Sequence, residues 1–203
     1  MTKTLCVFLL ALASAFIFPP ARAEGRLPAR HRLAAETVLR AAPDAAAPEA
    51  GLAQAGKDLE ILGFSEDGLW AEAGRGAGVA WLPAAGLTRL QPPADEGLPM
   101  RCYGTEPFWG LNMPSAFFAE FERPEHPEAP LQITGSDAAT GPGGHTRLWT
   151  FVGEELRGHL AVRNEACSDG MSDRHFGLSA VLSLAETAGA VHLRLGCCAL
   201  SAP

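Results

Sequence analysis

The chain has 203 residues, 47% of them hydrophobic, and it carries 16 basic against 23 acidic side chains. This acidic excess repels the phosphate backbone of DNA and RNA, so the composition excludes nucleic acid as an expected partner. The length suffices for one ordinary domain or for two small ones.

The first 23 residues have the pattern of a signal peptide. Lys3 gives a short basic start, residues 5–18 are apolar or small, and two prolines then precede Ala-Arg-Ala at 21–23, a typical cleavage site. The apolar run is shorter than the roughly 20 residues that a membrane-spanning helix needs. Cys6 lies at the start of this run, where a lipoprotein cysteine is not found. We therefore expect cleavage, no membrane span in the mature chain, and a periplasmic or secreted location.

Residues 24–34 are arginine-rich and without periodicity, so we expect a flexible lead-in there. Residues 41–55 are rich in alanine, but Pro43 and Pro48 interrupt any helix, and we expect a long loop. Short strands bounded by glycine, aspartate or proline are predicted at 37–40, 58–62, 69–73, 78–82 and 87–90. So many short strands in one segment predict a small β-barrel over residues 35–90.

The same segment carries a family pattern. A short strand leads into a proline at 39–43, residues 56–62 read Gly-x-x-hydrophobic-x-hydrophobic, Trp70 follows, and residues 76–82 contain Trp81. In these features residues 35–90 resemble the bacterial SH3-like domain, although Ala-Trp replaces the frequent Gly-Trp pair. For both tryptophans we expect core packing, which small barrels need; the alternative is recognition of a peptide by the aromatic side chains.

Residues 91–99 contain three prolines and read as a linker to a second domain over residues 100–203. Alternating strands are predicted there at 117–122, 147–152, 156–163, 178–184 and 191–195. Residues 153–155 fit a hairpin turn between two of them. The pattern predicts an antiparallel meander closed into a β-barrel, with apolar side chains inward and His159 and His192 outward. The predicted fold class is thus all-β: a small SH3-like barrel followed by a disulfide-braced meander barrel.

Four cysteines remain after cleavage of the signal peptide, and an even number in an oxidising compartment predicts two disulfides. We favour the pairs Cys167–Cys197 and Cys102–Cys198, while the crossed pairing stays open. A bond between the adjacent Cys197 and Cys198 is disfavoured because its ring is strained. A thiolate metal site with His175 or His192 is also disfavoured, since the chain has no Cys-x-x-Cys. We therefore predict no cofactor and no metal.

A dense polar loop follows Cys167. Asp169-Gly170 favours a turn, Ser172 or Asp173 can cap a short helical turn, and Arg174 can pair with the neighbouring carboxylates. The competing interpretation is a polar cluster capable of acid–base chemistry at the barrel mouth. Its members would be Glu106, Asp169, Asp173, Arg174 and His175. Sequence spacing does not show that Glu106 meets the loop, so we favour the structural interpretation.

The run Glu106-Pro107-Phe108-Trp109 precedes another strand. Pro107 favours an extended conformation at Glu106, and the two rings point to opposite faces of the strand that follows. One ring must then lie in the core and the other is free for binding. We therefore include Trp109 and Glu106 among the candidate binding residues.

Three ordered motifs give the second domain a family resemblance: Gly-Thr-Glu-Pro-Phe-Trp at 104–109, Cys-Ser-Asp-Gly-Met-Ser at 167–172, and Gly-Cys at 196–197. Residues 100–199 thereby resemble an uncharacterised family of bacterial envelope proteins. Phe176-Gly177 departs from the aromatic-proline pair that often follows the middle motif. The resemblance implies an exported barrel, often carried by lipoproteins, and no established activity.

The sequence thus favours a non-catalytic exported protein that binds peptidoglycan or an envelope protein. The candidate binding residues are Trp70, Trp81, Glu106, Trp109, Asp169, Asp173, Arg174 and His175. Two alternatives remain. One is an inhibitor of lysozymes, and the other is an enzyme or metal-handling protein that uses Glu106, Asp169, Asp173 and His175.

Overall fold

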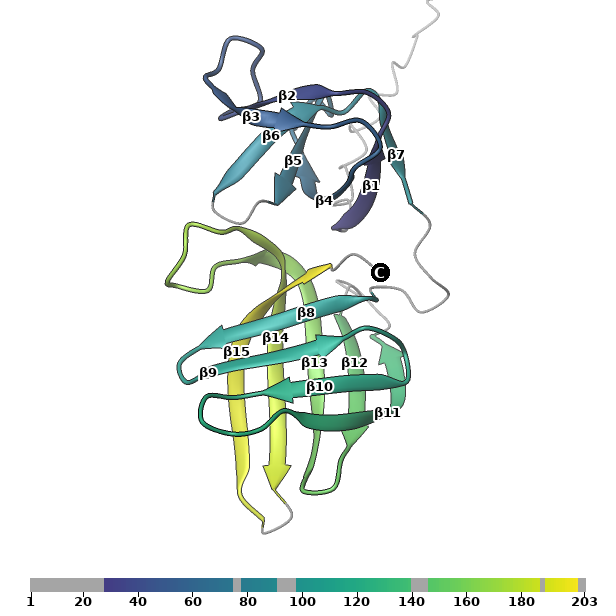
Figure 1. Cartoon of the computed structure of the whole chain (residues 1–203), viewed down its shortest axis with the longest axis vertical. Coiled ribbons are helices and arrows are strands. Elements are labelled where there is room, and N and C mark those ends of the chain that lie inside the picture. The colour runs from purple at the N-terminus through teal and green to yellow at the C-terminus, as the bar shows by residue number, and fades with distance from the viewer. Residues whose placement is uncertain (1–27, 75–77, 91–97, 140–145, 187–188, 201–203) are drawn as a thin grey trace, which may run out of the picture.

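A computed structural model describes residues 28–74, 78–90, 98–139, 146–186 and 189–200. It consists of two antiparallel β units, one above the other in Figure 1, with the loop at 168–175 and the end of the last strand between them. The described residues contain no helix, so the prediction of an all-β fold is confirmed. No helix in those ranges is long and apolar enough to cross a membrane. The predicted signal peptide lies outside the described residues.

The first unit is a seven-stranded antiparallel sheet in the order β3-β2-β6-β5-β4-β1-β7. Its strands are β1 (Ala29–Leu33), β2 (Thr37–Arg40), β3 (Glu49–Ala53), β4 (Asp58–Phe64), β5 (Trp70–Gly74), β6 (Val79–Pro83) and β7 (Leu87–Arg89). The core is formed by small and aliphatic side chains: Leu33, Leu39, Ala53, Ile61, Ala71, Ala73, Ala80 and Leu82. Neither tryptophan belongs to this core.

The expected lead-in at 24–34 contains a strand. β1 pairs with β4, so that Ala29 lies opposite Ile61, and it also pairs with β7. Its alternation places Ala29, His31 and Leu33 inward, where all three are buried. The outward Arg30 and Arg32 both bond the carboxylate of Asp58, at 2.9 and 2.8 Å. The strand was not predicted because its outward arginines pair with Asp58, which is distant in sequence, and local periodicity does not reveal such a partner.

The expected loop at 41–55 likewise ends in a strand. β3 pairs with β2, so that Thr37 lies opposite Ala53 and Val38 opposite Leu52. As predicted from Pro43 and Pro48, residues 41–55, all of which the structure describes, contain no helix. The alanine-rich composition concealed a strand because only Ala53 of β3 is buried.

The second unit is a closed eight-stranded antiparallel barrel, as predicted, in the order β10-β11-β12-β13-β14-β15-β8-β9. Its strands are β8 (Met100–Thr105), β9 (Phe108–Met113), β10 (Phe118–Glu122), β11 (Ala129–Ala138), β12 (Thr146–Val152), β13 (Leu156–Cys167), β14 (Phe176–Glu186) and β15 (Val191–Leu200). In Figure 1, β8 to β11 cross the front of the barrel at a steep angle to β12 to β15. Large rings fill the interior, including those of Trp109, Phe121, Trp149 and Phe151.

The prediction for the faces of the final strand was wrong. Arg194 lies opposite Leu182, and His192 opposite Leu184, two residues of the barrel core. The apolar residues of the alternation therefore point outward: Val191 is 67% exposed, and Leu193 and Leu195 are each 70% exposed. The face of each β15 side chain is set by Cys198, which follows this segment and lies in the core opposite Cys102. His159 on β13 is exposed as expected, and His192, although it lies opposite Leu184, is exposed as well.

Candidate functional site

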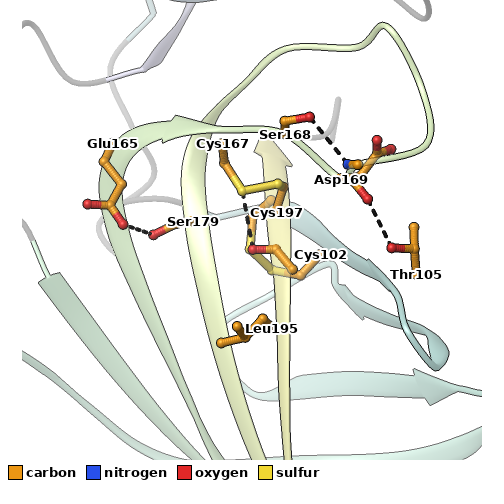
Figure 2. Close-up of a disulfide and its surroundings, with 12 residues drawn as sticks. Cys102, Thr105, Glu165, Cys167, Ser168, Asp169, Ser179, Leu195 and Cys197 are labelled. Carbon is orange, nitrogen blue, oxygen red and sulfur yellow. Dashed lines mark hydrogen bonds between the residues drawn. A yellow bond between two sulfur atoms is a disulfide. The ribbon is translucent and has the colours of Figure 1, made fainter.

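Two disulfides converge on β15. Cys102 bonds Cys198, and Cys167 bonds Cys197, the pairs favoured from the sequence. Adjacent residues of a strand point to opposite faces, so one strand serves both bonds without a vicinal bridge. Cys198 joins the barrel core, whereas Cys197 lies in a separate outer cluster with Phe176 and Ala199. Figure 2 shows the outer bond at the point where the polar loop leaves β13.

Asp169 organises this polar loop. Its carboxylate accepts hydrogen bonds from the backbone N–H groups of Met171 (3.0 Å) and Ser172 (2.8 Å) and from the Ser172 hydroxyl (2.8 Å). These bonds, led by that of the Ser172 N–H, hold the pKa of Asp169 below its usual range. The capping carboxylate is therefore that of Asp169, not that of Asp173. Gly170, at φ 73°, completes the turn.

The loop is also tied to the β8–β9 hairpin. The hydroxyl of Thr105 donates to the carbonyl of Asp169 at 2.9 Å, as Figure 2 shows. Glu106 lies in the turn of that hairpin, next to Thr105, and not in a continuous strand. Among the described residues its carboxylate has no hydrogen bond or ion pair with Asp173, Arg174 or His175. The structure therefore does not assemble the predicted acid–base cluster.

The remaining residues of the loop face the first sheet. The N–H of Gly78 donates to the carbonyl of Asp173 at 3.0 Å. His175 Nδ1 lies 3.6 Å from the Glu72 carboxylate on β5. Asp173 and His175 thus contact the first sheet, whereas Arg174, between them in the chain, lies over two aromatic rings of the barrel.

Arg174 lies 4.5 Å from the ring centre of Phe176 and 6.0 Å from that of Tyr103. Its charge acts on Glu60, a carboxylate of β4 that faces the barrel. The N–H of Leu200 donates to Glu60 Oε1 at 2.8 Å. Burial raises the pKa of Glu60, and the Leu200 bond and the Arg174 charge oppose this shift. Glu60 was not identified from the sequence, because a carboxylate on a polar strand face carries no local signal of its partner.

A glycine allows the two units to approach closely. A Cβ atom at Gly177 would collide with the ring of Pro28 and meet Leu62 Cδ2 at 3.5 Å. Gly177 directly follows Phe176, whose ring lies beneath Arg174. We define the contacts of the 173–177 segment and Leu200 with the first sheet as the interdomain junction.

Trp109 belongs to the barrel interior. It is 4% exposed, and its indole N–H donates to the carbonyl of Leu195 at 3.2 Å. Its ring occupies the space that a side chain at Gly104 or Gly196 would need. Trp109 is therefore not available as a surface binding residue. Phe108, 52% exposed on the opposite face of β9, is the outer ring of the predicted pair.

Trp70 and Trp81 lie on the outer face of the first sheet, contrary to the expectation of core packing. Trp81 is opposite Glu72 on β5 and opposite Arg40 on β2, and Trp70 is opposite Pro83. Both rings are half-buried and are diagonal neighbours on one face. The core positions of these strands belong instead to Ala71 and other small residues. We call Arg40, Trp70, Glu72 and Trp81 the tryptophan face.

The described residues contain no group of three histidine, cysteine, aspartate or glutamate side chains placed to hold a metal ion. His159 and His192 lie on β13 and β15, with β14 between them. Comparisons with protein-family models, with curated proteins and with solved structures gave no match to this chain. The functional argument therefore depends on the geometry of the two units alone.

Proposed function

We propose that this is a non-catalytic exported protein that binds peptidoglycan through the tryptophan face of its first unit. The observation that carries the proposal is the pair Trp70 and Trp81, which lie side by side on a sheet face outside either core. Aromatic side chains placed in this way need a reason beyond internal packing. The resemblance of residues 35–90 to bacterial SH3-like modules is part of this proposal.

The chemistry of the face suits a wall fragment. Indole faces attract C–H and cationic groups through their negative quadrupole, so they can stack on sugar rings and on peptide stems. Arg40 and Glu72 lie on either side of Trp81 and are paired with Glu49 and His175, each at 3.6 Å, so the charged ends of a stem peptide would exchange with these ion pairs. Glu72 is shared with His175, so a ligand here would lie beside the interdomain junction.

The loop supports a role without catalysis. Asp169 is used in folding the loop, and Asp173 and His175 contact the first sheet. These residues therefore have structural partners, which a catalytic role would have to disrupt. The two disulfides are compatible with an oxidising, exported location.

Sedimentation of the mature protein, residues 24–203, with purified peptidoglycan tests the proposal. We expect retention of the wild type, and a loss of more than about tenfold in retention for Trp81→Ala and Trp70→Ala, because aromatic anchors dominate binding energy. Leu69→Ala is the matched control, since Leu69 is exposed next to Trp70 and lies off the face. No retention of the wild type at any salt concentration would refute the proposal.

The same preparation separates the two alternatives. Release of soluble fragments from the peptidoglycan would indicate an enzyme. Inhibition of added lysozyme by the protein, without its own retention on the wall, would indicate a lysozyme inhibitor. Retention without either effect is the result that we expect.

A further inference from the structure

The outer side of β15 presents an unpaired strand edge. β8 pairs with β15 from Cys197 to Leu200 and still lies against Leu195 and Gly196, but the described residues provide no strand beside 191–194 on that side. In Figure 1 the β14–β15 hairpin runs past the lower end of the crossing strands β8 to β11. A free edge of this kind is a template for a further strand.

The backbone of this edge has a defined direction. Trp109 Nε1 reaches the carbonyl of Leu195 from the β9 side, so Leu195 points its backbone groups away from β14. Because strands repeat every two residues, the N–H and C=O groups of Leu193 and Val191 face the same way. These are the groups that an added strand would bond.

The side chains beside the edge are apolar on the outer face of the barrel. Leu148, Ala161, Val181 and Leu195 lie directly opposite one another across four strands. Val191, Leu193 and Val152 extend the patch, and each is at least half exposed. Exposed apolar patches of this kind mark interaction sites.

The ionisable side chains of the edge strand itself are basic, whereas the chain as a whole is acidic. The charged or titratable side chains of β15 are His192 and Arg194, and those of the outer positions 157–161 on β13 are Arg157 and His159. The chain as a whole has a net charge of −7. In addition, Arg194 Nε is shielded from solvent and has no hydrogen-bond partner among the described residues.

We propose that the free edge of β15 binds an extended, acidic segment of another protein, which adds to the barrel as a strand. Its aliphatic residues would lie beside Val191 and Leu193, and its carboxylates beside His192 and Arg194. A second copy of this chain fits poorly, because antiparallel pairing of two such edges would place His192 and Arg194 against like charges.

A labelled synthetic peptide of alternating glutamate and valine, titrated into the mature protein and followed by fluorescence anisotropy, tests this proposal. We expect saturable binding that weakens with salt, and no binding of the matched peptide with lysine in place of glutamate. Arg194→Glu should weaken binding of the acidic peptide by more than about tenfold, because it places like charges together.

Leu193→Pro tests strand addition itself. Proline removes an N–H that faces the free edge and spares the ladder to β14, so the barrel should stay folded by near-UV circular dichroism while peptide binding is lost. Leu69→Ala is the control that should leave binding unchanged. Equal binding of the two peptides, full binding by the Leu193→Pro protein, concentration-dependent dimerisation without peptide, or binding to anionic vesicles in place of the peptide would each overturn the proposal.

Discussion

The two β units differ in the composition of their cores and in their disulfide bonds. The first sheet has a core in which four of the eight buried residues are alanine, and no disulfide joins its strands. The central core of the barrel contains two tryptophans and two phenylalanines, and both disulfides join barrel strands. Small side chains bury little apolar area, which is the main source of folding free energy. We therefore expect the barrel to be the more stable unit and the first sheet to be stabilised by its junction with the barrel.

The largest expected effect comes from breaking the barrel bonds. The Cys102–Cys198 bond spans 96 residues, and its removal by Cys102→Ala with Cys198→Ala should cost roughly 4–5 kcal/mol in the chain-entropy model. The Cys167–Cys197 bond spans 30 residues and should cost roughly 3–4 kcal/mol. Urea unfolding followed by tryptophan fluorescence measures both. A larger loss for the shorter loop would contradict the entropic account.

A matched pair of core variants compares the two units directly. Leu82 in the first sheet and Leu160 in the barrel are both fully buried. Leucine-to-alanine changes in cores cost about 2–5 kcal/mol. We expect Leu82→Ala to unfold the first sheet in a separate, earlier transition, and Leu160→Ala to lower the main transition. Hydrogen exchange resolved by segment measures this, and a single shared transition in both variants would show that the units do not differ.

Gly177→Val tests the junction without touching either core. Its side chain would collide with Pro28, so we expect the units to separate at a cost of about 1–3 kcal/mol, the usual range for overpacking. The amide of Gly78, which donates to Asp173, should then exchange faster. Gly63→Val is the control, since a Cβ at Gly63 meets no atom within 4 Å. Unchanged exchange at Gly78 would show that the junction tolerates the collision.

The smallest expected effect is a dependence of the junction on pH. Burial raises the pKa of Glu60 in the folded protein above its unfolded value of 4.5. The folded state therefore binds a proton more readily, and the contribution of Glu60 to docking is greatest below pH 4.5 and falls as pH rises through its folded pKa. Arg30 on β1, Arg174 and the Glu72–His175 pair face the same region. Glu60→Gln keeps an acceptor for Leu200 and should remove this dependence from the Gly78 exchange rate.

The contribution of Asp169 to stability changes with pH in the opposite direction to that of Glu60. Its pKa is lowered in the folded loop by hydrogen bonds from Ser172 and Met171, so its contribution is present above the unfolded value of 3.8 and is lost as pH falls through the folded pKa. Asp169→Asn should therefore weaken the loop at neutral pH and flatten its acid response. Exchange at the Ser172 amide measures the change, and an equal acid response in the variant would assign it to another group.

The sequence was most informative where one face of a strand is buried and the other polar. The predicted strands at 147–152 and 156–163 coincide closely with β12 and β13, because buried Trp149 and Leu160 alternate there with exposed residues. β1, β3, β8 and β11 were missed. For example, β1 owes its place to pairing with distant strands, and the second half of β11 is exposed on both faces. Neither the pairing of distant strands nor the exposure of both faces can be predicted from local periodicity.

For the candidate site, too, contacts with residues distant in sequence were not predicted. Alternation alone predicted that the rings of Phe108 and Trp109 lie on opposite faces, but not that Trp109, a candidate binding residue, is the buried one. Which residues the loop contacts was not predicted, because Glu60 and Glu72 lie about a hundred residues before it and on a different sheet. The apolar residues of β15 were assigned to the core since nothing in 191–195 marks them as exposed.

The nested cysteine pairing has a consequence for biosynthesis. In chain order the first cysteine of the barrel bonds the fourth and the second bonds the third. A chain that enters an oxidising compartment from its N-terminus delivers Cys102 and Cys167 first, and bonding them in order of arrival yields a non-native pair. Maturation of the barrel then requires thiol–disulfide exchange, so its yield in the cell should depend on a disulfide isomerase as well as on an oxidase.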